Sequence, residues 1–262
     1  MSNPTISDWT GRRVWILGAS SGIGAALARE LAARGARVAV SARRRSALQA
    51  LAKELPHGLA LTCDASDPQQ IATVAAKLQA QWGGIDMAIY AAGVWYPMDA
   101  TELGAEAIDA INATLDINLR GAMHFAATLI PLLREAGAGS LAFIGSVAGY
   151  RALPRAVVYG TSKAALAYFA ATLHLELTPT GIGVYLVSPG FVDTPMTVSN
   201  DFPMPAMIPP EQAAKEIVAG FASGDFEIHF PKRLTRPMRW ARMLPDGLYF
   251  PLVRKLTSAT RK

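Results

Sequence analysis

Short runs of apolar residues alternate with longer amphipathic stretches along most of the chain. Runs such as 14–17 and 141–144 have the length of strands rather than of helices. Between the runs, apolar residues recur at helical spacing, with polar residues at the other positions. The pattern predicts strands at 14–17, 37–41, 58–63, 85–91, 140–145, 183–187 and 226–230, and helices at 25–34, 48–55, 68–82, 105–135 and after Pro154 to about 177.

This alternation predicts an α/β fold with a parallel sheet. Parallel neighbours need a crossover, and the predicted helices supply one after each strand. We expect a Rossmann-type, doubly wound parallel sheet in three α/β/α layers, forming one domain over residues 1–230. Pro131 should bend the long helix predicted at 105–135. Ligands of such sheets bind at the carboxyl ends of the strands.

A glycine-rich turn follows the first predicted strand. Gly18, Gly22 and Gly24 form the pattern Gly-x-x-x-Gly-x-Gly, and the positions between them include Ser20, Ser21 and Ile23. Glycines let the backbone approach a pyrophosphate, and the following helix presents its N-terminal N–H groups. The strand–turn–helix context indicates dinucleotide binding. A tight turn without a ligand is the alternative that this motif alone leaves open.

The end of the second predicted strand indicates which dinucleotide is bound. An acidic residue near this point binds the ribose 2′-hydroxyl of NAD, whereas a nearby arginine accommodates the 2′-phosphate of NADP. This chain has no acid there and has Arg43, Arg44 and Arg45. We therefore expect NADP(H) to be favoured over NAD(H), with Arg43 as the phosphate ligand. Arg44 and Arg45 can instead open a solvated helix.

Three further features lie at or near the ends of predicted elements. Asp64 follows the third strand, where its carboxylate can reach an adenine edge or cap the next helix. Ala91, Ala92 and Gly93 end the fourth strand with little side chain, as a flat cofactor lying across it requires. Asn118 stands inside a predicted helix, where asparagine is locally unfavourable, so it serves a polar site or faces solvent.

Residues 146–163 carry the candidate chemistry. Ser146 ends the fifth predicted strand, and Tyr159 and Lys163 are four residues apart, on one face of a helix. A free tyrosine titrates at about 10, and a neighbouring ammonium favours the phenolate and lowers that pKa. Tyr159 would then exchange a proton with a substrate oxygen near the working pH. A solvated tyrosine beside a surface lysine is the alternative for the pair alone.

Composition excludes several other kinds of protein. The chain has 262 residues, of which 51% are apolar, so a sizeable core is expected. Cys63 is the single cysteine, which excludes an intrachain disulfide and a cysteine-based metal cluster. We expect no metal site, because the histidines show no close pairing: His57, His124, His174 and His229. The N-terminus lacks a signal-peptide pattern and no apolar run could span a bilayer, so we expect a cytoplasmic protein.

The C-terminal segment is basic. Residues 232–262 hold nine Lys/Arg and one acidic residue, a net charge of +8, whereas the rest holds 16 Lys/Arg against 19 Asp/Glu. Apolar and aromatic residues such as Trp240 and Phe250 are interleaved with the arginines. We treat residues 231–262 as an amphipathic extension that could lie on an anionic membrane surface, close a subunit interface or cover the substrate pocket. No nucleic-acid-binding module is recognised.

Together these motifs resemble the short-chain dehydrogenase/reductase family, in its single-domain branch of about 250 residues. The resemblance covers roughly residues 11–230. It rests on motifs in the family's order: Gly18-x-x-x-Gly22-x-Gly24, Asp64, Ala91-Ala92-Gly93, Asn118, Ser146, Tyr159-x-x-x-Lys163, and Pro189-Gly190 with Thr194. One departure is Tyr90-Ala91-Ala92-Gly93, where the family often has Asn-Asn-Ala-Gly, which puts the support of the central strands in doubt.

The resemblance implies a role for each matched position. Tyr159 would be the general acid in reduction and the base in oxidation, and Ser146 would hydrogen-bond the substrate oxygen. Lys163 would hold the nicotinamide ribose and lower the tyrosine pKa, and Asn118 would hold a water in a proton relay. The nicotinamide side would be lined by Pro189, Gly190, Val192 and Thr194. The family also implies a homo-oligomer, usually a dimer or tetramer.

We therefore expect an NADP(H)-dependent oxidoreductase that interconverts a ketone or aldehyde and an alcohol. Three segments should border its substrate pocket: 94–96, 147–155 and 191–207. The last is rich in proline, methionine and phenylalanine, which suggests an apolar lid over an apolar substrate, although ordinary packing explains the same residues. A 3-oxoacyl thioester reductase is the runner-up, and a non-catalytic nucleotide-binding scaffold is the alternative of another class.

Overall fold

A parallel sheet of seven strands forms the centre of the molecule, a computed structural model that describes residues 2–198 and 200–258. The strand order is β3-β2-β1-β4-β5-β6-β7, and every neighbouring pair is parallel. The strands are β1 (Arg13–Leu17), β2 (Arg37–Ala42), β3 (Leu59–Thr62), β4 (Met87–Tyr90), β5 (Gly139–Ile144), β6 (Ile182–Pro189) and β7 (Glu227–Phe230). All seven predicted strands are therefore present.

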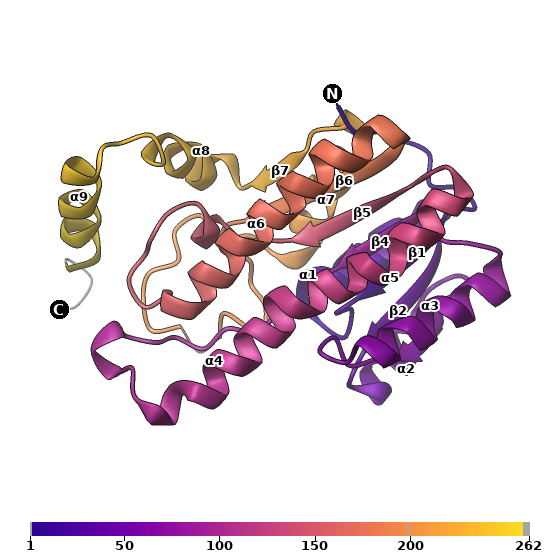
Figure 1. Ribbon diagram of the computed structural model, residues 1–262, viewed down its shortest axis with the longest axis horizontal. Coiled ribbons are helices and arrows are strands. Elements are labelled where there is room, and N and C mark those ends of the chain that lie inside the picture. Colours follow the sequence, from indigo (N-terminus) through magenta and orange to yellow (C-terminus); the bar gives the residue numbers. More distant parts are fainter. Residues whose placement is uncertain (1, 199, 259–262) are drawn as a thin grey trace.

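Helices cover both faces of the sheet, which gives the three predicted layers (Figure 1). One layer contains α1 (Gly22–Ala33), α2 (Arg45–Glu54) and α7 (Pro210–Ser223). The other contains α3 (Pro68–Trp82), α4 (Ile108–Leu115), α5 (Gly121–Ala136) and α6 (Val157–Leu177). Two more helices, α8 (Lys232–Ala241) and α9 (Asp246–Ser258), follow β7. The prediction of a doubly wound Rossmann-type fold is confirmed.

The apolar character of the strands follows from this sandwich. Along β1, Val14 and Ile16 face the core shared with α1 and α7, whereas Trp15 and Leu17 face the core shared with α3 and α5. All four side chains are fully buried. Each such side chain contributes about 1.5–3 kcal/mol when it leaves water. A strand buried on both sides must therefore be apolar at every position, as the sequence pattern indicated.

The long helix predicted at 105–135 is interrupted. After α4, residues Asp116–Arg120 form a π-helical turn, and α5 begins at Gly121. The Gly121 N–H donates to the carbonyl of Asp116, five residues back, instead of four. Such wide turns are often found at functional sites, and this one carries Asn118. Pro131 lies inside α5, and the bend expected at this residue stays a prediction.

The sheet order reverses between β1 and β4. Chain connections run outward from this point in both directions, so the loops after β1 and β4 diverge to opposite sides of the sheet. A crevice opens at such a switch point, at the carboxyl ends of the strands. The predicted site residues at the ends of β1, β4 and β5 therefore face one crevice. No helix within the described part of the chain is long and apolar enough to cross a bilayer.

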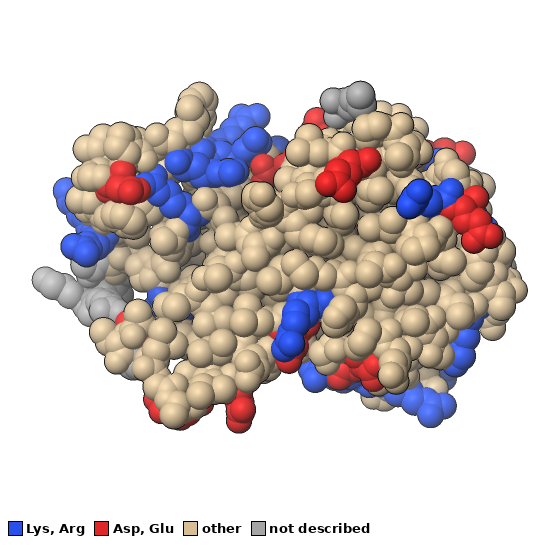
Figure 2. Space-filling model, in the orientation of Figure 1, with Lys and Arg blue, Asp and Glu red and all other residues tan. Residues whose placement is uncertain are grey.

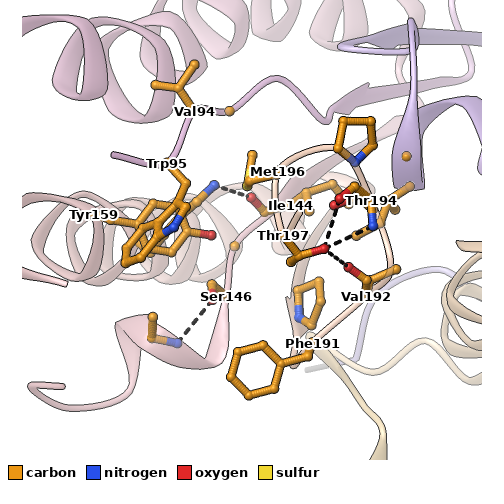
Figure 3. Close-up of a pocket in the computed structure, with 18 of the residues that line it drawn as sticks. Val94, Trp95, Ile144, Ser146, Tyr159, Phe191, Val192, Thr194, Met196 and Thr197 are labelled. Atoms are coloured by element: carbon orange, nitrogen blue, oxygen red, sulfur yellow. Dashed lines mark hydrogen bonds between the residues drawn. The ribbon is translucent and has the colours of Figure 1, made fainter. Parts of the chain in front are cut away.

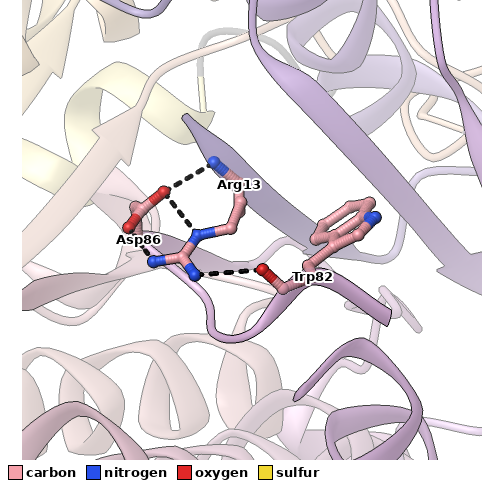
Figure 4. A network of polar contacts seen from close by, with 3 residues as sticks. All are labelled: Arg13, Trp82 and Asp86. Carbon is pink, nitrogen blue, oxygen red and sulfur yellow. Dashed lines mark hydrogen bonds and ion pairs between the residues drawn. The ribbon is translucent and has the colours of Figure 1, made fainter. Parts of the chain in front are cut away.

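At the opposite end of the sheet, an ion pair fixes the start of β1. The Arg13 guanidinium makes two hydrogen bonds to the Asp86 carboxylate, from Nε at 2.9 Å and from Nη2 at 2.5 Å, and the Arg13 backbone N–H adds a third at 2.7 Å (Figure 4). Its Nη1 also donates to the carbonyl of Trp82, at the end of α3. This network therefore ties α3 and the start of β4 to β1.

An Asp86→Asn substitution should lower the free energy of unfolding by about 1–3 kcal/mol at pH 7, because it breaks a bidentate, charge-assisted contact. Burial by itself would raise the pKa of Asp86, but the hydrogen bonds from Arg13 outweigh burial and hold the pKa below its usual value. The pair therefore stabilises the fold above the unfolded pKa of about 3.9, and this stabilisation is lost as the pH falls through the folded pKa.

Urea unfolding at pH 7 and at lower pH measures this difference. Glu54→Gln is the matched control, because Glu54 pairs with Arg29 on the exposed surface, where ion pairs contribute little. A loss that is equal in the two variants, or unchanged by pH, would contradict the structural role given to Asp86.

Candidate active site

The glycine-rich turn after β1 forms the floor of the crevice. Gly18 has a φ of +104°, and a Cβ at this position would overlap the backbone of Ala91 and Ala92 at the end of β4. A Cβ at Gly24, in the first turn of α1, would overlap the carbonyl of Gly18. Both glycines are therefore required for the strand ends and the helix N-terminus to meet this closely, which leaves a backbone-lined cradle suited to a pyrophosphate.

A cavity of about 1170 Å³ extends from this cradle along the ends of the strands. It is larger than the roughly 300–1,000 Å³ of a typical single-ligand pocket, so it has space for a dinucleotide and a second molecule. Nearly all of the predicted site residues line it: Gly18, Ser20, Ser21, Gly22, Ile23, Gly24, Arg43, Asp64, Ala92, Gly93, Ser146, Tyr159, Lys163, Pro189, Gly190, Val192 and Thr194. Asn118 does not line the cavity and lies behind its wall.

Arg44 is a cavity residue that the sequence analysis did not select. Its Nη2 donates to the Ser20 carbonyl at 3.2 Å, to Ser20 Oγ at 3.1 Å and to Ser21 Oγ at 3.0 Å. Arg43 also lines the cavity, whereas Arg45 is the first residue of α2. The signal was present as a run of three arginines after β2, but its spacing alone does not say which guanidinium reaches the cradle.

Asp64 lies in the cavity wall and not at a helix cap. Its Oδ1 accepts hydrogen bonds from the Ser66 N–H at 2.9 Å and from Ser66 Oγ at 2.7 Å. Asp67 caps α3 instead, accepting from the N–H groups of Gln69 and Gln70. The helix-cap alternative for Asp64 is therefore wrong.

Tyr159, on α6, and Ser146, at the end of β5, line the same part of the cavity and lie close together (Figure 3). Burial raises the pKa of Tyr159, and a hydrogen bond with Ser146 opposes this rise. Ser146 Oγ also accepts from the Ala148 N–H at 3.1 Å, which fixes the orientation of the serine.

Lys163 lies one turn after Tyr159 on α6, and its Nζ is 5.7 Å from the centroid of the tyrosine ring. Nζ donates to the Ile144 carbonyl at 2.8 Å, and burial lowers the lysine pKa to about 8. We expected the ammonium to lower the tyrosine pKa. In this arrangement burial has the larger effect on both groups and shifts each toward its neutral form.

Asn118 is fully buried in the π-helical turn and is tied to the loop after β4. Its Oδ1 accepts from the Val94 N–H at 2.8 Å, and its Nδ2 donates to the Val94 carbonyl at 3.0 Å. Nδ2 also donates to Ser162 Oγ, on α6, at 3.2 Å. A Cβ at Gly93 would lie 3.4 Å from Asn118 Oδ1 and 3.6 Å from Lys163 Nζ. Asn118 therefore joins three segments immediately behind the reacting centre.

Trp95 covers the tyrosine. Its ring packs edge-on against the ring of Tyr159, with centroids 4.9 Å apart and planes at 81°. Its Nε1 donates to Asn200 Oδ1 at 2.8 Å, so the indole also holds the segment after β6. We expected residues 94–96 to border the pocket, and Val94 and Trp95 of this segment line the cavity.

The segment after β6 closes one side of the cavity. Thr197 Oγ1 donates to the carbonyls of Val192 and Thr194, which closes a compact turn (Figure 3). Farther along, Asp201 forms an ion pair with Arg155, on the opposite rim. The apolar side chains of this segment that line the cavity are Phe191, Val192, Pro195, Met196, Phe202, Pro203 and Pro205.

The C-terminal helices border the same cavity. Figure 2 shows Lys and Arg side chains gathered over α8 and α9. Arg151, in the loop between β5 and α6, lies 3.9 Å from the centroid of the Tyr249 ring and pairs with Asp246. Its Nη1 donates to the carbonyls of Ala241 and Leu244. The tail residues that line the cavity are Met238, Arg254, Leu256 and Thr257.

Within residues 2–198 and 200–258, no group of three or more His, Cys, Asp or Glu is placed to hold a metal ion. His229, on β7, contacts Thr235 through Nδ1 at 2.6 Å, and burial lowers its pKa to about 4. Its imidazole is therefore neutral at physiological pH and packs as part of the structure.

Two crystal structures resemble this fold closely. A short-chain dehydrogenase from Burkholderia cenocepacia J2315, in complex with NADP, superposes with a TM-score of 0.82 over 94% of this chain and 99% of that one, at 23% identity. A 3-ketoacyl-(acyl-carrier-protein) reductase from Brucella melitensis, complexed with NADH, gives a TM-score of 0.76 over 84% of this chain and 98% of that one, at 22% identity. At these identities the likeness concerns the fold.

Similarity in sequence identifies the family as well as the fold. An uncharacterized oxidoreductase from Myxococcus xanthus (strain DK1622) is 34% identical over 259 residues, which cover 96% of this chain and all of that protein. The family model described as short chain dehydrogenase matches residues 12–202. The chain therefore belongs to the short-chain dehydrogenase/reductase family of NAD(P)-dependent oxidoreductases, which act on CH–OH and C=O groups.

Proposed function

We propose that this protein is an NADP(H)-dependent oxidoreductase that interconverts a ketone or aldehyde and an alcohol on a mostly apolar substrate. The observation that supports this proposal is the convergence of Ser146, Tyr159 and Lys163 on the cavity that begins at the glycine cradle. A backbone cradle, an acid–base group and an apolar cover are the parts that hydride transfer to a carbonyl requires from a protein.

The cofactor preference rests on the arginines. The cradle would hold the pyrophosphate, with Arg43 and Arg44 near the ribose 2′-phosphate and Asp64 near the adenine. Of the two structural neighbours one holds NADP and the other NADH, so they do not favour either cofactor. Two guanidinium groups without an acid at the end of β2 favour the doubly charged 2′-phosphate.

When bound, the nicotinamide ring supplies or accepts the hydride. In reduction, Tyr159 donates its phenolic proton to the carbonyl oxygen as the hydride reaches the carbon, and in oxidation it accepts the hydroxyl proton. Burial raises the tyrosine pKa, which keeps the phenol protonated and ready for reduction. Ser146 Oγ stabilises the developing charge on the same oxygen. Lys163 would return a proton to Tyr159, and a water held by Asn118 would relay the replacement proton from solvent.

The substrate end of the cavity favours an apolar molecule. Trp95, Met196 and Phe202 surround the space beside Tyr159, and Met238 and Leu256 of the C-terminal extension border it. We propose that the described part of the extension, residues 231–258, covers the substrate pocket in preference to the other roles considered for it. A 3-oxoacyl thioester, whose acyl part is also apolar, is the second candidate. Oligomerisation and contact of the basic extension with a membrane surface stay predictions.

A Tyr159→Phe substitution should lower kcat by about 10²–10⁴-fold, because it removes the transferable proton and retains the ring. NADPH affinity should change little. Tyr168→Phe is the matched control, since Tyr168 lies on the same helix with its side chain 78% exposed. Loss of NADPH absorbance with 4-nitrobenzaldehyde and a panel of apolar ketones measures turnover.

Unchanged turnover of Tyr159→Phe on any accepted substrate would defeat the mechanism. Cofactor binding without turnover on any carbonyl would favour the scaffold alternative.

Arg43→Ala and Arg44→Ala should each weaken NADPH binding by about tenfold or more, because a charge-assisted contact with a phosphate is lost. NADH binding should change much less, since NADH lacks the 2′-phosphate. Fluorescence titration with each nucleotide measures both affinities. Arg45→Ala, at the start of α2, is the control. Equal losses for NADPH and NADH would refute the 2′-phosphate role.

A further inference from the structure

We infer that Tyr90 is a positioning residue for Asn118, acting through the π-helical turn that carries the asparagine. This inference rests on the proposed role of Asn118 in catalysis and extends it to a residue in the sheet. Tyr90 stands where the family often has an asparagine, so the support described here belongs to this chain's own residues.

Tyr90 connects β4 directly to that turn. Its hydroxyl donates to the carbonyl of Ile117 at 2.5 Å, and its side chain is fully buried. The ring packs edge-on against Phe125 of α5, with centroids 5.5 Å apart, and Phe125 packs in turn against Trp15 of β1 at 4.8 Å. Burial raises the pKa of Tyr90, so the hydroxyl stays protonated and remains a donor. A rigid aromatic stack therefore presents one hydrogen-bond donor to the residue before Asn118.

The absence of a side chain at Gly121 makes room for this contact. A Cβ at Gly121 would overlap both the Tyr90 hydroxyl and the carbonyl of Ala65. The Gly121 N–H bonds to Asp116, five residues back, which makes the turn wider than an α-helical one. The phenol reaches the next carbonyl in this widened turn. Tyr90 and Gly121 thus form a matched pair that stabilises the π-helical geometry.

The widened turn sets the position of the Asn118 side chain. Asn118 is the next residue after Ile117, and its amide bonds to both backbone groups of Val94 and to Ser162. Without the Tyr90 contact, the buried Ile117 carbonyl loses a partner, and the turn can relax toward α-helical spacing. That change would rotate Asn118 away from Val94 and from the neighbourhood of Lys163. Tyr90 therefore affects the site indirectly, through the position of Asn118, and contacts neither Tyr159 nor Lys163.

The test compares Tyr90→Phe with Tyr185→Phe. Tyr185 is a fully buried tyrosine on β6 whose hydroxyl donates to the Pro4 carbonyl, in the opposite core layer. Both variants lose one phenol–carbonyl hydrogen bond, which is buried at Tyr90 and partly buried at Tyr185, so both should be destabilised. Only Tyr90→Phe should also lower kcat with 4-nitrobenzaldehyde, by about tenfold, while the KM for NADPH stays within about twofold.

Hydrogen–deuterium exchange of the ligand-free protein supplies a readout that does not depend on activity. In Tyr90→Phe, amide exchange should accelerate at Val94 and over 116–121, because Val94 N–H is bonded to Asn118. In Tyr185→Phe these amides should exchange as in the wild type. Matching kcat values and exchange rates in the two variants would overturn the inference and leave Tyr90 a packing residue.

A double substitution separates this inference from the proposed function. If Tyr90 acts through Asn118, Tyr90→Phe combined with Asn118→Ala should lower kcat no further than Asn118→Ala alone. Fully additive losses would show that Tyr90 acts by another route, against the inference. An Asn118→Ala variant with wild-type kcat would instead contradict the proposed role of Asn118. In that case faster exchange at Val94 in Tyr90→Phe would still support the positioning contact itself.

Discussion

The close approach of the chain segments that follow β1 and β4 is the constraint on which the site depends. Gly18 touches the backbone of Ala91 and Ala92, and Gly24 touches Gly18, so two strand ends and one helix N-terminus meet without intervening side chains. The crevice opens at this meeting point because the sheet order reverses there. A side chain at Gly18 would separate the two strands and fill the cradle, so fold and binding site share one steric requirement.

Burial determines the electrostatics of the reacting centre. Tyr159 and Lys163 are removed from water together, and desolvation moves their pKa values in opposite directions, the tyrosine upward and the lysine downward. Both shifts favour neutral groups and reverse the ordinary order of the two pKa values, so that Tyr159 holds its proton more tightly than Lys163 does. Once Tyr159 has given up its proton, transfer of a proton from the Lys163 ammonium to the phenolate is therefore favourable.

Most of the fold and site follow from local sequence signals. The alternation of strand and helix patterns defined the layers, and the motifs at strand ends identified the cavity residues, because parallel strands bring their carboxyl ends together. Three features depend on contacts that local patterns do not encode. The π-helical turn requires Tyr90 and Gly121 to meet across layers, the cradle contact of Arg44 depends on one rotamer, and Arg151 binds a segment about 90 residues away. Asp67, not Asp64, is the cap of α3 because the chain turns once more before the helix begins.

The position of the C-terminal extension has a consequence for how this protein can diversify. The match to the family ends at residue 202, yet Met238, Leu256 and Thr257 border the cavity. The proposed reacting groups therefore lie within the matched part of the chain, and part of the cavity wall belongs to a segment outside it. Arg151, in the loop that connects β5 to α6, links the matched part of the chain to the terminal segment by contacts with Ala241 and Asp246. Under the proposed function, exchange of the terminal segment would alter which substrates fit the cavity and leave the proposed reacting groups in place.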